Sequence, residues 1–291
     1  LCEGTVHSLT PYEWTFTAKA SPFGPWVIGT AADTAGDTDA DVLRADTDGS
    51  TLTPLLIGVG AAASGSNAAL DPALHASTAQ GDAVLCFASI RNSGTGTPDT
   101  PTGYTLLAGT ANARVFGKVA GAAEGAPHVT FTGGVANATT LARTVTYRNI
   151  GLTLWAAAAE QLNGSAQNVG FPAYSGLGTS GLLVVFGWKQ DDWTSVDPLV
   201  PGLVDEVFEL SSTTGDDAAM VVDHTLMTAD VFGGGTGSGS FTVTGGAAAI
   251  SRGIVFGLKL ADVPAGSTTL TVAPPSGPLW STVADDYPLY L

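Results

Sequence analysis

The sequence predicts an all-β protein, a β-sandwich or jelly roll built from two related halves. Its composition is the first reason: 12% of the 291 residues are charged, whereas 38 are glycine and 16 are proline. Such a profile is typical of many short strands joined by tight turns. The second reason is that residues 81–91 and 181–189 form apolar runs of strand length. Unbroken apolar runs are expected of central strands covered on both faces.

The third reason is an internal repeat whose landmarks recur in the same order about 100 residues apart. The matching segments are 55–63 with 152–159, 71–73 with 171–173, 81–91 with 181–189, 101–104 with 201–203, 114–116 with 220–222, 129–134 with 241–246, and 142–147 with 251–256. We interpret them as two halves, 53–151 and 152–262. Each half either closes as an immunoglobulin-like sandwich, or the halves interleave into one jelly roll. Residues 155–162 suit a short helix as well as a strand.

Two extended segments flank the sandwich region 53–262. Residues 1–52 read as an N-terminal arm that contains an acidic loop, and residues 263–291 read as a Pro-rich tail with an apolar end. An apolar terminus beyond a stiff linker docks either on its own sandwich or on a neighbouring subunit. We therefore expect assembly contacts from the aromatic and apolar residues of both segments. These residues are Trp14, Phe16, Trp280, Tyr287, Tyr290 and Leu291.

Charge and cysteine content exclude several classes of partner. The formal net charge is −16, which repels nucleic acid and anionic membranes. No run of 18 apolar residues and no signal-peptide pattern occurs, so we expect no membrane segment. Cys2 and Cys86 are too few for a disulfide scaffold. Cys86 is interpreted as a small buried apolar residue, with a Cys2–Cys86 bridge as the alternative.

The acidic loop of the arm is the candidate metal site, and Ca²⁺ is the one cofactor that the sequence suggests. Carboxylates at alternating positions supply the hard oxygen ligands that Ca²⁺ prefers. The pattern lacks the glycine and the final glutamate of an EF-hand loop, and a solvated loop without a cation is the alternative. The candidate ligands are Asp37, Asp39, Asp41, Asp46 and Asp48.

A second candidate site follows the second apolar run. Asp191 and Asp192 lie between Trp188 and Trp193, and carboxylates beside aromatic rings are typical of sugar-binding sites and glycosidases. A strand-end loop with a half-buried tryptophan is the alternative. Catalytic motifs are otherwise absent from the sequence. The four histidines are scattered, and Gly176-x-Gly178-x-x-Gly181 precedes a strand rather than the helix that binds a dinucleotide. We therefore expect no catalytic residues and no enzyme activity.

Five ordered segments carry a resemblance to a known module. They are Gly81-Asp82-x-Val84-Leu85, Thr100-Pro101-x-Gly103-Tyr104-Thr105-Leu106-Leu107, Arg114-Val115-Phe116-x-Lys118-Val119-Ala120, Val129-Thr130-Phe131-Thr132 and Tyr147-Arg148-Asn149-Ile150. Together, residues 53–262 resemble a β-sandwich module of tail-associated and other minor virion proteins of tailed bacteriophages. Similar modules occur in secreted bacterial surface proteins.

The resemblance implies a virion protein without catalytic residues. It implies a structural part that forms a homo-oligomer, such as a trimer, and contacts other virion proteins. A tail location (minor tail, tip or fibre) is the first expectation, and a capsid decoration or head fibre is the alternative. A module that binds host-surface carbohydrate through the Trp188–Trp193 segment is a further alternative, and a sandwich-type glycoside hydrolase is the last.

Overall fold

The computed structural model describes residues 54–261 except 92–95, 176–180, 198–204, 228–234 and 237, together with four short strands nearer the termini. The chain divides into two compact units, one of residues 52–261 and one of residues 1–51 with 262–291. In the second unit β1 (Trp14–Thr17) pairs antiparallel with β23 (Ser267–Leu270). There β2 (Trp26–Thr30) also pairs with β3 (Val42–Ala45). The two ends of the chain thus contribute strands to the same unit.

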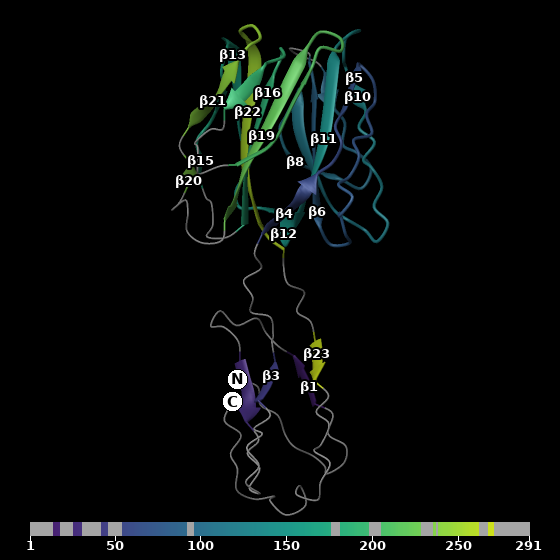
Figure 1. The fold of residues 1–291 in the computed structure, drawn as a ribbon, viewed down its shortest axis with the longest axis vertical. Helices are drawn as coiled ribbons and strands as arrows, with labels where there is room; N and C mark the ends of the chain where they lie inside the picture. Colours follow the sequence, from purple (N-terminus) through teal and green to yellow (C-terminus); the bar gives the residue numbers. More distant parts are fainter. Residues whose placement is uncertain are drawn as a thin grey trace, which may run out of the picture. The chain divides into compact units, whose positions relative to one another are not determined.

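The larger unit contains two main antiparallel sheets, one from each half of the sequence (Figure 1). The first has the order β4-β11-β6-β9-β8, with β5 also paired to β11. Its strands are β4 (Leu55–Val59), β5 (Ala63–Ser66), β6 (Ala83–Ile90), β8 (Thr105–Ala108), β9 (Ala113–Val119) and β11 (Thr139–Arg148).

The second main sheet has the order β12-β22-β16-β19-β18, with β13 also paired to β22. Its strands are β12 (Ile150–Leu154), β13 (Ala159–Ala166), β16 (Gly181–Lys189), β18 (Asp205–Ser212), β19 (Ala218–Met227) and β22 (Ala249–Leu260). Strand by strand, this order repeats that of the first sheet. β12 begins at Ile150, two residues before the predicted start of the second half. Apart from those residues, neither main sheet takes a strand from the other half, so the interleaved jelly roll considered from the sequence is not the arrangement observed.

Smaller sheets cover the outer faces of the main sheets. β7 (Thr97–Pro98) pairs with β10 (Phe131–Thr132) in the first half. In the second half β17 (Ser195–Asp197) pairs with β21 (Gly239–Thr244), which also pairs with β14 (Val169–Phe171). β15 (Tyr174–Ser175) pairs with β20 (Gly235–Thr236). The β7–β10 pair thus corresponds to β17–β21, and the isolated bridge between Leu70 and Val129 corresponds to β14–β21, whereas β15–β20 has no counterpart among the described strands of the first half.

Three apolar clusters hold these layers together. The central cluster lies between the main sheets, where Phe87 meets Phe186 and Phe208 edge to face at centroid distances of 5.3 and 5.7 Å. An outer cluster around Cys86 covers the first sheet, and another around Phe241 covers the second. Alternate residues of β6 and β16 enter the central and outer clusters, because side chains alternate across a strand. Every residue of both strands is consequently buried.

The prediction of an all-β sandwich is confirmed for the described residues, which contain no helix. Residues 155–156 form a bend, residues 157–158 have no regular structure and residues 159–166 form β13, so the helix alternative for 155–162 is excluded. No helix of the described residues is long and apolar enough to cross a membrane. Cys86 is a free, buried thiol, and burial raises its pKa to about 12. Cys2 lies outside the described residues.

Candidate functional site

Loops of both halves meet at one end of the sandwich. We call this surface the rim and define it as residues 91, 137–139, 190–194, 213–217 and 245–248. Arg91 Nε donates to the carbonyl oxygen of Gln190 at 3.4 Å, and its guanidinium pairs with the Asp216 carboxylate at 3.4 Å. Thr139 Oγ1 donates to the carbonyl oxygen of Thr214 at 2.7 Å. Polar contacts at the rim therefore join the first half to the second.

Three half-buried carboxylates gather on the rim. Oxygen atoms of Asp191, Asp192 and Asp217 all lie within 4.8 Å of one another. The Ala247 amide donates to Asp191 Oδ2 and holds that carboxylate against the β21–β22 turn. Gly246 in this turn has φ +71°, and a Cβ atom there would lie 2.0 Å from the carbonyl oxygen of Asp192. Glycine is required at that position because the loop carrying Asp192 passes so closely.

A buried lysine accompanies this cluster. Lys189 ends β16 and is fully buried, and its Nζ has no hydrogen-bond partner. Burial lowers the pKa of Lys189, while the charges of Asp191 and Asp192 raise it. Carboxylate oxygens are the ligands that Ca²⁺ takes, yet the ammonium of Lys189 already offsets part of their charge. The cluster is an acidic surface feature and is not by itself a metal site.

The structure removes both tryptophans from the candidate sugar site. Trp188 is fully buried in the central cluster, and Trp193 is 5% exposed within the outer cluster of the second half. A sugar ring stacks on an exposed aromatic face, and neither residue offers one. This corrects the sequence-based hypothesis: of its four residues, only Asp191 and Asp192 have partly exposed side chains. The apolar run 181–189, expected to be covered on both faces, already indicated the burial of Trp188.

The other predicted site residues lie outside the described residues. These are the carboxylates of Asp37, Asp39, Asp41, Asp46 and Asp48, and the residues Trp280, Tyr287, Tyr290 and Leu291. Trp14 and Phe16 belong to β1 by their backbone pairing, and their side chains lie outside the description. The predictions of a Ca²⁺ loop and of terminal assembly contacts therefore stay predictions.

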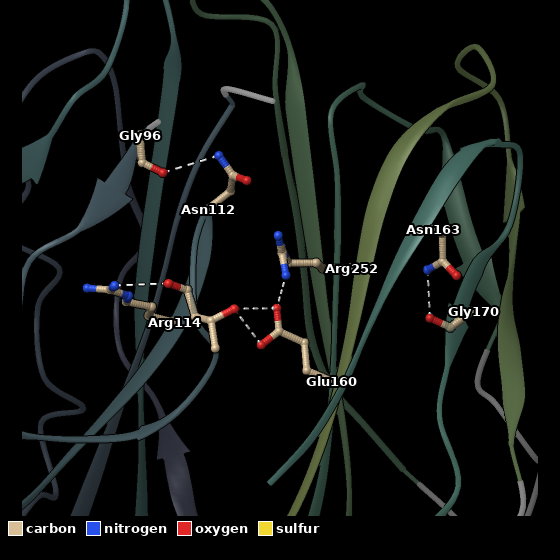
Figure 2. Close-up of polar contacts among 8 residues, drawn as sticks. Gly96, Asn112, Arg114, Glu160, Asn163, Gly170 and Arg252 are labelled. Atoms are coloured by element: carbon tan, nitrogen blue, oxygen red, sulfur yellow. Dashed lines mark hydrogen bonds and ion pairs between the residues drawn. The ribbon is translucent and has the colours of Figure 1, made fainter. Parts of the chain in front are cut away.

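A second network of polar contacts joins the two halves, and none of its residues was predicted as a site residue from the sequence (Figure 2). Glu160 of β13 pairs with Arg252 of β22, and their side chains are 15% and 12% exposed. The Thr110 hydroxyl, from the β8–β9 loop of the first half, donates to both Glu160 oxygens at 3.1 and 3.0 Å. Arg114 in turn donates to the Thr110 carbonyl at 3.0 Å. This network closes one side of the sandwich.

The three described histidines make structural contacts. His224 on β19 lies in the interior, 3.0 Å from the hydroxyl of Tyr147 on β11. Burial lowers the pKa of His224 to about 4, and the charge of Asp205 offsets a part of this shift. His128 Nδ1 lies 2.7 Å from the Asp71 carboxylate. The His75 ring covers Gly58 so closely that a Cβ atom there would be 2.5 Å from it.

The chain matches no protein-family model, no curated protein and no solved structure.

Proposed function

We propose that this protein is a non-enzymatic structural component of a tailed-bacteriophage virion, located in the tail as a minor tail, tip or fibre protein. The observation that carries the proposal is the division of the chain. A sandwich with its own apolar cores forms one unit, and both ends of the chain form another, in which β1 pairs with β23. A separate unit made from both termini suits attachment to neighbouring subunits while the sandwich stays intact. The resemblance of residues 53–262 to minor virion modules points to the same role.

The charged side chains of the sandwich support a scaffold role. Lys118 pairs with Glu124 at 2.6 Å, and Arg148 pairs with Asp82 at 2.8 Å. The pairs Arg91–Asp216 and Arg252–Glu160 stabilise loops and strand pairs at the borders between the halves. Asp82 is 2% exposed and also accepts the Ala79 amide at 2.9 Å. These basic side chains thus contact acidic groups of the same chain, which suits a structural role.

The location can be tested on particles of the phage that encodes the chain. An antibody against the sandwich, detected by immunogold electron microscopy, should label the tail. Labelling over the capsid would instead assign a decoration or head-fibre role. The control is an immunoblot that detects the denatured protein in infected cells. If the protein is made but intact particles carry no label, a virion role is contradicted.

Self-association is tested separately by native mass spectrometry of the purified chain. We expect a multiple of the 29.2 kDa chain mass. A monomer at every concentration up to the highest soluble one would contradict the homo-oligomer.

The carbohydrate-binding alternative required exposed rings of Trp188 and Trp193, and both residues are buried. The glycoside hydrolase alternative paired Asp192 with a second carboxylate such as Glu206, and it stays a prediction.

A further inference from the structure

Strand β18 ends the second main sheet. It pairs along one side with β19, and the described residues place no strand along its other side. An edge strand presents unpaired backbone N–H and C=O groups that can pair with another chain. β18 has eight residues, whereas its counterpart β8 has four. The second half therefore offers the longer edge for strand addition.

The exposed part of β18 is acidic, and its carboxylates take part in no described ion pair. Asp205 and Glu206 are exposed and Glu209 is half-buried. The described ion pairs involve none of the three. Burial and the neighbouring Glu209 charge raise the pKa of Glu206.

Strand β18 is nevertheless firmly held by its other side chains. Phe208 enters the central cluster and packs against Phe87 at 5.7 Å, and Leu210 packs against the same cluster. The Arg143 guanidinium lies over the Phe208 ring at 5.1 Å. Beyond the register shift between Glu206 and Phe208, the strand is thus held in place by packing, which lowers the entropy cost of adding a strand to it.

We propose that β18 is a strand-addition site for an extended basic segment of another protein. A second copy is disfavoured, because antiparallel pairing of two β18 strands would gather the carboxylates of both copies along one shared edge, and the register that sets Glu206 against Glu209 would place like charges directly opposite. The net charge of −16 opposes that pairing as well. A strand with alternating lysine or arginine side chains would form the backbone ladder and neutralise the edge. The biological meaning of such a partner rests on the proposed structural role, but the binding chemistry is tested independently of it.

Charges on an edge strand also occur as a protection against aggregation. The two roles give opposite results. A protective edge binds no strand, and its neutralisation causes self-association. A docking edge binds a complementary strand, and its neutralisation weakens that binding.

The test uses the full chain and a short synthetic peptide of alternating lysine and valine, labelled for fluorescence anisotropy. We expect saturable binding that weakens with salt, and slower hydrogen exchange of the β18 amides in the complex. Two matched peptides serve as controls: one replaces each lysine by glutamate, and one carries N-methyl groups at alternate backbone nitrogens. Both should bind at least about tenfold more weakly, because the first lacks charge complementarity and the second lacks ladder donors.

Variants of the protein localise the site. Glu209→Lys and, separately, Glu206→Lys should each weaken binding about tenfold. Asp197→Lys makes the same charge change at an exposed position of β17 and should leave binding within about twofold. Thermal unfolding of each variant verifies that the fold is retained.

Three results would overturn the proposal. They are no saturable binding up to about 1 mM peptide, equal binding of the N-methylated peptide, and self-association of a Glu206→Gln, Glu209→Gln double variant without peptide binding by the unmodified chain. Each leaves the immunogold and native-mass tests of the virion role unaffected.

Discussion

The two halves share a strand order but differ in the chemistry of equivalent positions. Arg143 on β11 and Arg252 on β22 occupy corresponding places in the repeat, and their cross-strand partners Phe87 and Trp188 both belong to the central cluster. Arg143 lies over the Phe208 ring at 5.1 Å and donates to the Gly60 carbonyl at 3.1 Å. Arg252 instead pairs with Glu160. Burial lowers the pKa of both arginines. A common scaffold thus uses two different ways to hold a partly buried guanidinium.

The strand ends differ in the same manner. The first half continues from β6 into Arg91, whereas the second continues from Lys189 into Asp191 and Asp192. Arg91 binds across to the second half through Gln190 and Asp216. Because the shared strands are buried, they are under the same packing constraint in both halves. The charged side chains that distinguish the halves are therefore found at the rim and at β18.

The largest effect is expected where the halves are most alike, in the central cluster. Phe186→Ala should lower the free energy of unfolding by about 3–5 kcal/mol, because it removes a fully buried ring and leaves a cavity between the sheets. Urea unfolding followed by tryptophan fluorescence measures the change. Leu162→Ala is the control, since Leu162 is 61% exposed, and it should change stability by no more than about 0.5 kcal/mol. A loss below about 1 kcal/mol for Phe186→Ala would mean that the sheets do not pack through this ring.

The next largest effect is a pH dependence that the second half contributes through His224. Burial lowers the pKa of His224 to about 4, below the ordinary 6.5, so the unfolded chain binds more protons between these values. The contribution of neutral His224 to stability is complete above pH 6.5 and is lost as the pH falls toward 4. The loss amounts to about 3 kcal/mol. Urea unfolding at intervals across this range measures it.

The matched variant for this prediction is His224→Gln. It should show a flatter pH dependence between pH 6.5 and 4, with the Tyr147 hydroxyl still able to bond to the side chain. Hydrogen bonds from Arg148 and the Ala79 amide lower the pKa of Asp82. Acidic groups of this kind lose their contribution to stability only when the pH falls below the usual range of carboxyl pKa values. An identical pH dependence in the variant and the unmodified chain would rule out His224 as the source.

A smaller effect is expected at the Glu160–Arg252 pair, which only the second half contains. Glu160→Gln should cost roughly 1–3 kcal/mol, because it leaves the Arg252 guanidinium partly buried without its counter-charge. The control is Asp71→Asn, which removes the carboxylate that contacts His128. The side chains of His128 and Asp71 are 63% and 65% exposed, so this variant should lose no more than about 0.5 kcal/mol of stability. Denaturant unfolding at neutral pH compares the two variants. Equal, negligible losses would show that the Glu160–Arg252 pair is solvated and does not close the sandwich.

Several features of the fold could be predicted because local periodicity encodes them. Residues 83–90 and 181–189 are buried throughout, as their unbroken apolar character indicates. The order of the repeated landmarks agrees with the order of strands in the two main sheets. Gly246 ends one of these landmarks, and the structure shows why glycine is needed there, in the close approach of the Asp192 carbonyl.

The candidate site was less predictable, because its members come from separate loops. Asp191 and Asp192 are neighbours in the chain, but Asp217 joins them from the β18–β19 turn. Thr110 and Glu160 meet across the halves, and no spacing rule connects positions so far apart. Trp188 illustrates the opposite error: an aromatic residue near two aspartates indicated a ligand, although it ends an apolar run that was expected to be buried on both faces.

The sequence by itself determined the class of the fold, the two halves and the buried central strands, since alternation and apolar runs are properties of consecutive residues. Tertiary structure alone decided that each half keeps its own sheet, that Tyr147 meets His224, and that β1 pairs with β23. It also decided that β18 forms an acidic edge. These features depend on which surfaces pack together, and packing is determined by the shape and charge of distant segments jointly.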